Sequence, residues 1–137
     1  MNKIESLANM FRGWGLSFIV AIDDDKQGRE VYKSMRRELF GDDEQLASQC
    51  LIKFPGCSSI EDAFSKQDFA RLVANDDESA IKTTNGEYMK SASRSKPVVA
   101  FQFALAVEKG AIQLQTLTTE SQDRIRIIVE AIASRLS

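Results

Sequence analysis

The sequence predicts an α/β domain in which a mostly parallel sheet is flanked by helices. Residues 16–22 (LSFIVAI) form a continuous apolar, β-branched run, which is typical of a strand buried on both faces. Residues 49–54 (QCLIKF) indicate a second short strand, which Pro55 and Gly56 end. Between the two strands, residues 27–40 have helical spacing, as expected of a strand–helix–strand unit. The apolar face of this helix carries Val31, Met35 and Leu39.

Helices are also expected near both ends of the chain. Residues 3–12 form a short amphipathic helix that ends near Gly13. Residues 120–136 form the last helix, and Thr119 and Gln122 have the spacing of a capping box. The apolar positions of the first helix are Ile4, Leu7, Ala8 and Phe11, and those expected to face inward on the last are Ile125, Ile128, Val129, Ile132 and Leu136.

The middle of the chain is expected to hold shorter elements. Residues 41–45 (GDDEQ) predict a surface turn. Short helical pieces follow over residues 60–64 and 67–73, with Ser65 as a cap three residues ahead of Asp68.

The polar stretch over residues 74–95 predicts a mobile loop. A mostly apolar helix comes next, with Ser95 near its cap, Pro97 in its first turn and Gly110 at its end.

Composition limits the classes of protein and of site. The 137 residues, 43% of them hydrophobic, fit a single domain over residues 1–137 with its core in residues 4–110. The absence of histidine from the sequence excludes histidine bases, His-ligated zinc and Ser-His-Asp chemistry. A metal site must therefore use mainly oxygen ligands, which favours magnesium, manganese or calcium. No apolar run approaches the ~20 residues that span a bilayer, so we expect a soluble, cytoplasmic protein with no membrane partner.

Three aspartates, Asp23, Asp24 and Asp25, follow the first predicted strand directly. In open α/β sheets, ligands lie beyond the carboxyl ends of the strands. Two carboxylates one residue apart can both reach one hard cation, and without a cation such close like charges resist ionisation. The alternative is a polar strand-to-helix turn in which Asp25 caps the following helix.

A second polar cluster, Ser59, Glu61 and Asp62, follows the second strand, and Lys96 stands at the start of a helix. If the strands are neighbours, the two acidic groups face each other across a crevice. A lysine at a helix start opposes the helix dipole, so Lys96 is a candidate for contacting a phosphate. The alternatives are acids that favour the amino end of a short helix and a solvated lysine.

These clusters, in this order, resemble the Toprim domain of the OLD (overcoming lysogenization defect) family nucleases, which join an ATPase to a carboxyl-terminal Toprim nuclease. The family pattern is a strand ending in D-x-D followed by Gly, a later S-x-E-D segment, and a lysine just ahead of a helix. The resemblance covers most of residues 4–110. The matching residues are Asp23, Asp25, Gly28, Ser59, Glu61, Asp62 and Lys96.

The resemblance implies a Toprim-like (Rossmann-like) fold and metal-dependent cleavage of DNA phosphodiesters. It implies that Asp23 and Asp25 hold one Mg²⁺ or Mn²⁺ and that Ser59 and Glu61 help to hold a second. Lys96 would stabilise charge on the scissile phosphate, so Lys96 and Glu61 are the implied catalytic residues. The implied partners are DNA and an ATPase domain or subunit, and a homo-oligomer is a further option.

The chain departs from the family at its start. The first Toprim strand, which carries a metal-binding glutamate, has no counterpart, and Glu5 on its amphipathic helix does not fill that role. The G-x-x-x-x-G-K-[ST] motif of an ATPase is also missing from the sequence. We therefore expect a truncated Toprim fragment or subunit that needs a partner for activity. The alternative is a non-catalytic interaction module that binds an ATPase partner, and a phospho-accepting receiver domain is disfavoured because the second strand ends in KFPG.

Overall fold

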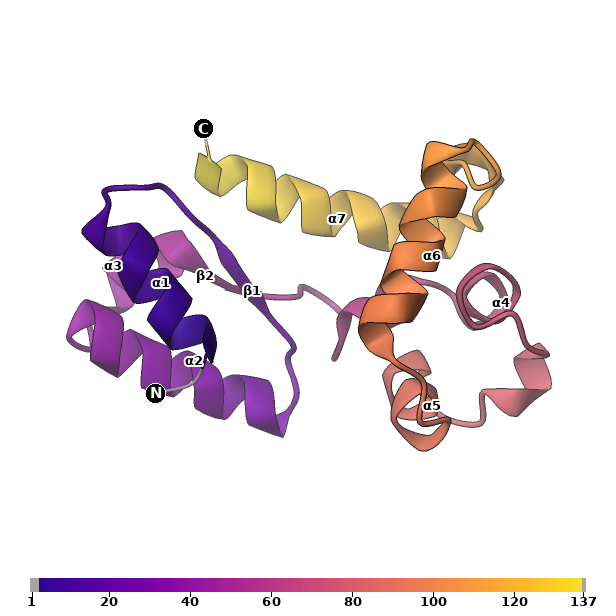
Figure 1. Cartoon of the computed structure of the whole chain (residues 1–137), viewed down its shortest axis with the longest axis horizontal. Coiled ribbons are helices and arrows are strands. Elements are labelled where there is room, and N and C mark those ends of the chain that lie inside the picture. The colour runs from indigo at the N-terminus through magenta and orange to yellow at the C-terminus, as the bar shows by residue number, and fades with distance from the viewer. Residues whose placement is uncertain (1–2, 137) are drawn as a thin grey trace. The chain divides into compact units, whose positions relative to one another are not determined.

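The computed structural model describes residues 3–136, and the chain divides into two compact units (Figure 1). Unit 1 comprises the chain up to Ser59 together with the segment from Ile128 onward, and unit 2 comprises residues 60–127. The single domain predicted over residues 1–137 stays a prediction. None of the helices within residues 3–136 is long and apolar enough to cross a membrane.

Unit 1 contains a small parallel sheet, which agrees with the predicted α/β class. The strands β1 (Val20–Ile22) and β2 (Leu51–Lys53) pair in register, with Val20 opposite Leu51 and Ile22 opposite Lys53. Within the described residues the sheet has these two strands. The helices of the unit are α1 (Lys3–Gly13), α2 (Lys26–Phe40), α3 (Glu44–Cys50) and the end of α7 (Thr119–Leu136).

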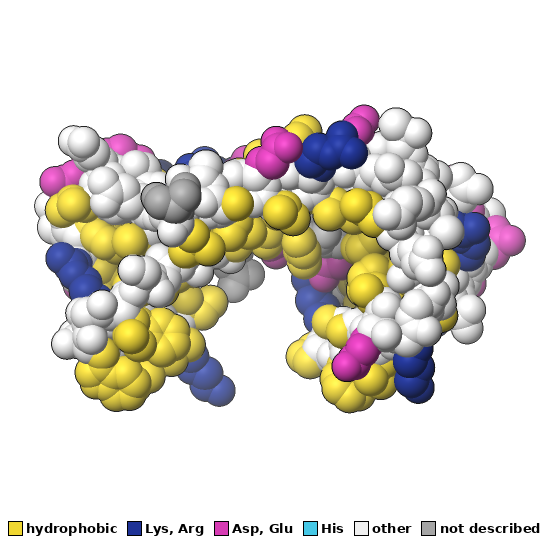
Figure 2. Space-filling view, turned by 90° about the horizontal axis from the view of Figure 1, so that it is seen from above, with side chains coloured by type: hydrophobic (Ala, Val, Ile, Leu, Met, Phe, Trp, Pro, Cys, Tyr) yellow, Lys and Arg dark blue, Asp and Glu magenta, His cyan; other side chains and the backbone are white. Residues whose placement is uncertain are grey.

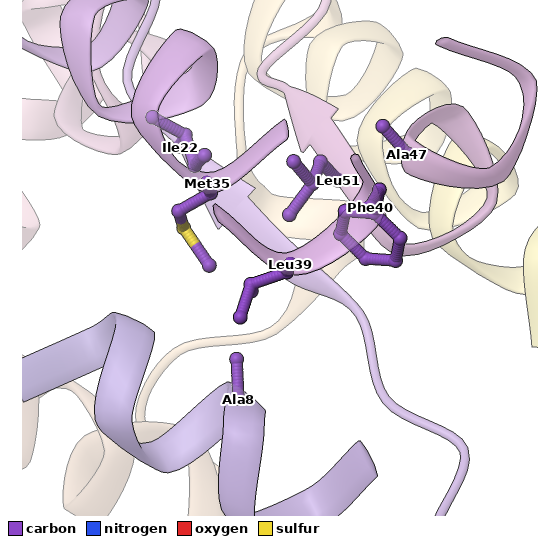
Figure 3. Packing of buried hydrophobic residues seen from close by; sticks show 7 residues of the cluster. All are labelled: Ala8, Ile22, Met35, Leu39, Phe40, Ala47 and Leu51. Carbon is purple, nitrogen blue, oxygen red and sulfur yellow. The ribbon is translucent and has the colours of Figure 1, made fainter. Parts of the chain in front are cut away.

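The core of unit 1 lies between α1, α2, α3 and the sheet, as Figure 3 shows. Met35 and Leu39 of α2 pack with Ile22 of β1 and Leu51 of β2, so the predicted apolar face of this helix is confirmed. The remaining buried members are Ala8, Phe40 and Ala47.

The prediction of a seven-residue strand buried on both faces is wrong. The strand β1 has three residues, Ala21 is exposed, and Leu16 is 51% exposed. Burial differs between the two strands, because Leu51 and Ile52 of β2 are both buried whereas only Ile22 of β1 is. The surface turn predicted over residues 41–45 is also too long, because Asp43 accepts a hydrogen bond from the Leu46 amide and starts α3.

The predicted first helix is present, but its buried face is not the most apolar one. Glu5 and Ala8 are buried, whereas Ile4 and Leu7 are 49% and 48% exposed. Helical periodicity identified the element without identifying which side packs on the core.

Unit 2 is built from short helices around an aromatic and aliphatic core. Phe69, Ala70, Ala74, Ile81 and Met89 form this core, and Val99 packs against it. The elements of the unit are η1 (Ile60–Ala63), α4 (Lys66–Asp68), η2 (Phe69–Ala74), η3 (Glu78–Ala80), α5 (Asn85–Ser91), α6 (Lys96–Glu108), η4 (Leu114–Thr116) and the start of α7.

The mobile loop predicted over residues 74–95 is wrong, because this stretch contains η3 and α5. Thr84 and Glu87 form a capping box at the start of α5, and Met89 anchors the helix in the core. The Thr-x-x-Glu spacing was the signal in the sequence that could have revealed this helix.

The predicted cap at Ser65 is confirmed, since its hydroxyl accepts from the Asp68 amide at 3.2 Å. The cap of α7 is Thr118 rather than Thr119, because the Thr118 hydroxyl accepts from the Ser121 amide at 3.4 Å. Of the residues expected to face inward on α7, Ile128 is buried, but Val129 and Leu136 are 57% and 61% exposed.

Candidate functional site

The three aspartates form the turn between β1 and α2, at the carboxyl end of the strand. All three side chains are half-buried. The Asp25 carboxylate accepts a hydrogen bond from the Gly28 amide at 2.7 Å and caps α2. The alternative in which Asp25 caps the following helix is therefore confirmed. Whether the turn also suits a metal ion depends on the chemistry of its side chains.

Gly28 is required by the geometry of this turn. A Cβ atom at position 28 would lie 1.8 Å from the carbonyl oxygen of Asp23 and 3.1 Å from Cγ2 of Ile22. No side chain tolerates so short a distance to a backbone atom, so only glycine lets the first turn of α2 pack onto Asp23. Gly28, the glycine that follows the D-x-D pattern, thus lets the Asp23 backbone lie against the first turn of α2.

The middle aspartate is engaged by cationic side chains. Arg29 donates to the Asp24 backbone oxygen at 3.0 Å and lies 3.4 Å from its carboxylate, and the Lys53 ammonium lies 3.8 Å from the same carboxylate. Lys53 ends β2, and the Phe54 amide donates to the Ile22 carbonyl at 3.1 Å. The carboxyl ends of the two strands therefore lie side by side, and the strands are neighbours in the sheet.

Ser59 is buried in unit 1, and Glu61 and Lys96 belong to unit 2. Glu61 lies in the single turn of η1 with its side chain almost fully buried, and its Oε1 accepts from the Lys96 ammonium at 2.7 Å. Lys96 is the first residue of α6, and its side chain is 43% exposed. A charge-assisted hydrogen bond of this length offsets part of the cost of burying the carboxylate.

Aromatic packing keeps α6 close to η1. The rings of Phe64, just after η1, and Phe103, on α6, meet edge to face with centroids 5.2 Å apart. Val99 on the same helix packs against the core of unit 2. These contacts hold the start of α6 where Lys96 reaches Glu61.

Two further residues support η1, and the sequence did not reveal either. The Asn85 side chain donates to the carbonyls of Glu61 and Phe64, and its backbone amide donates to the Asp62 carboxylate at 2.9 Å. Arg124 donates to the Asp62 carbonyl at 2.9 Å. Both contacts join segments far apart in sequence, so no local spacing announces them.

Unit 2 also contains a fully buried carboxylate outside the predicted site, Asp68. Its Oδ2 accepts from the Ser121 hydroxyl at 2.5 Å, and from the hydroxyl and the amide of Thr118 at 2.7 and 2.8 Å. Burial by itself raises the pKa of the Asp68 carboxyl, but hydrogen bonds from Ser121, Thr118 and Ser65 outweigh it and leave the pKa below its ordinary value. This network joins α4 to the start of α7.

The chemistry of the donors fits Mg²⁺ or Mn²⁺. Asp23, Asp25, Ser59 and Glu61 offer only hard oxygen atoms, which these ions prefer. Among the residues that the structure describes, neither unit contains a group of three acidic or cysteine side chains that could hold an ion. Asp23 and Asp25 stand in one turn of unit 1, and Glu61 stands against Lys96 in unit 2.

Comparisons with protein-family models, with curated proteins and with solved structures find no match to this chain.

Proposed function

We propose that the chain is a Toprim-like subunit or fragment of a metal-dependent nuclease, which hydrolyses DNA phosphodiesters with Mg²⁺ or Mn²⁺ and needs an ATPase partner for full activity. The observation that carries the proposal is the contact between Glu61 and Lys96, at 2.7 Å. It joins the two implied catalytic residues, although one follows β2 and the other starts α6. A cytoplasmic location belongs to the same proposal.

Each proposed role follows from the side chain. Asp23 and Asp25 in unit 1 would hold one ion, and Glu61 in unit 2 would help to hold the other. When bound, the ions would supply an activated water and support for the leaving oxygen, which suits a chain without histidine. Lys96 is half exposed, so its ammonium can meet a phosphate oxygen and stabilise the negative charge that develops there.

Calorimetry with Mn²⁺ tests the metal site. The double variant Asp23→Asn, Asp25→Asn removes both charges but keeps a good helix cap at position 25, because Asn caps about as well as Asp. We expect it to lose Mn²⁺ binding. The matched control is Asp24→Asn, which changes one charge in the same turn and should keep binding. Equal Mn²⁺ affinity in the double variant and the natural chain would rule out this site.

A plasmid-nicking assay tests the activity. We expect the isolated chain to nick DNA poorly and to gain activity with the products of neighbouring genes, because the first glutamate of the Toprim pattern is missing from the sequence. Lys96→Met should abolish the gained activity. Robust nicking by the isolated chain would show that the missing acid is dispensable.

The second candidate function is a non-catalytic module that binds an ATPase partner, and exposed apolar side chains favour it. On α6, Val98 and Phe101 are 54% and 63% exposed, and on unit 1 Trp14 is 67% exposed. Figure 2 shows such hydrophobic side chains at the surface. Co-purification with a neighbouring ATPase, without metal-dependent nicking by the complex, would favour this candidate.

A further inference from the structure

Asn85 occupies an unusual position for a first helical residue, because it is 2% exposed and its side chain points back to a different element. Its Nδ2 donates to the Glu61 carbonyl at 2.9 Å and to the Phe64 carbonyl at 2.8 Å. One amide nitrogen thus binds both a residue of η1 and the residue that follows it.

The turn η1 needs such support. It has four residues, and the hydrogen bonds of a 3₁₀ segment have poorer geometry than those of an α-helix. Within the turn and its exit, the Phe64 amide donates to the Glu61 carbonyl at a long 3.3 Å. The two bonds from Asn85 and the bond from Arg124 to the Asp62 carbonyl therefore hold the backbone on which Glu61 stands.

The chemistry of Asn85 is specific to an amide. Two hydrogen bonds from one side-chain nitrogen require an NH₂ group, which Asp, Ser and Thr lack. Asn85 Oδ1 is buried and has no hydrogen-bond partner among the described residues. An unsatisfied acceptor destabilises the fold, so the side chain is used here for its donors.

We propose that Asn85 is a positioning residue, which fixes the backbone of η1 so that the Glu61 carboxylate meets the Lys96 ammonium. The consequence of this positioning for catalysis rests on the proposed nuclease function. The effect of Asn85 on the contact between Glu61 and Lys96 does not depend on that function. Val99 anchors the start of α6 on the core of unit 2, away from η1, so we expect loosening η1 to move Glu61 more than Lys96.

Nuclear magnetic resonance of the Lys96 side chain tests the positioning. The ¹⁵Nζ signal of Lys96 is recorded for the natural chain and for Glu61→Ala, which removes the acceptor and so defines the signal of the broken pair. We expect Asn85→Ala to move the Lys96 signal to the Glu61→Ala position. Asn85→Asp keeps the size of the side chain and an acid suited to a helix start, but it removes both donors, so it should give the same shift.

The matched control is Thr84→Ala, which removes the cap of the same helix, α5, without touching η1. A merely structural role for Asn85 predicts equal effects of Thr84→Ala and the Asn85 variants. We expect Thr84→Ala to leave the Lys96 signal at its natural position. If folded Asn85→Asp gives the Lys96 ¹⁵Nζ signal at the same position as the natural chain, the proposal is overturned.

Mn²⁺ calorimetry on the same variants separates the two proposals. Removing a residue that orients a metal ligand weakens metal binding on the order of ten- to hundredfold, and we expect this for Asn85→Asp. If the Lys96 signal moves as expected while Asp23→Asn, Asp25→Asn binds Mn²⁺ as tightly as the natural chain, the positioning role stands and the nuclease proposal fails.

Discussion

The acidic turn of unit 1 and the Glu61–Lys96 pair of unit 2 are assembled in opposite ways. In the turn, the hydrogen bonds of Asp25 and Asp24 reach Gly28 and Arg29, only a few residues along the chain. A contact from farther along the chain, the Lys53 ammonium, lies 3.8 Å from the Asp24 carboxylate. In unit 2, Glu61 depends on partners from α5 and α6. A site made of neighbours in sequence fails when its own turn is altered, whereas a site made of distant segments fails when any supporting element moves.

The largest expected effect comes from Gly28→Ala. The added methyl would lie 1.8 Å from the Asp23 carbonyl oxygen, so the turn and α2 must separate. We expect the free energy of unfolding to fall by about 3 kcal/mol, the upper end of the range for overpacked cores. Hydrogen exchange should show the loss in unit 1.

The control for this variant is Gly13→Ala. Nothing lies within 4 Å of a Cβ at position 13, which ends α1. Alanine should be neutral or slightly stabilising there. Equal stability of the Gly28→Ala and Gly13→Ala variants would contradict the close approach.

Asp68→Asn is expected to have the next largest effect on stability. It replaces a buried acceptor of Ser121 and Thr118 hydrogen bonds by a group that presents an NH₂ to one side of the network. We expect a loss of about 2 kcal/mol, seen as faster exchange in α4 and at the start of α7. Asp123→Asn, an exposed acid on α7, serves as the control and should be nearly neutral.

The pH dependence of unit 2 follows from the same carboxylate. The pKa of Asp68 is lower in the folded state than in the unfolded chain, so the unfolded chain binds more protons at acid pH. The stability that Asp68 contributes is present above its unfolded pKa of about 3.9 and is lost as the pH falls through the folded value. Urea unfolding at pH 7 and at lower pH should show a flatter pH dependence for Asp68→Asn than for the natural chain.

Arg29→Ala should have the smallest effect. Its contacts with Asp24 are exposed to solvent and screened, so we expect a change within about 0.5 kcal/mol. A change several times larger, measured by the same urea titration, would show that the cations around Asp24 organise the turn.

Local patterns accounted for much of the fold. The apolar face of α2, the cap at Ser65 and the start and end of α6 were all predicted correctly, because each depends on residues within one or two turns. Two expectations failed for different reasons. The buried face of α1, which includes Glu5, is set by tertiary contacts, whereas the helix α5 carried a local signal, the capping box of Thr84 and Glu87, within a stretch expected to be a loop.

The candidate site divides in the same way. The aspartate turn and its glycine could be predicted, since a strand end, a cap and a close approach are local. The supports of η1 could not, because an amide that binds two carbonyls from another segment has no periodicity and no fixed spacing. Asn85 looked like an ordinary polar residue in a polar stretch.

The most direct measurement is the anomalous diffraction of crystals grown with Mn²⁺. If a divalent ion neutralises the acids that follow β1, a manganese peak will stand within coordination distance of the Asp23 and Asp25 carboxylates. Full-occupancy density for both side chains with no manganese between them would contradict the nuclease proposal at its foundation.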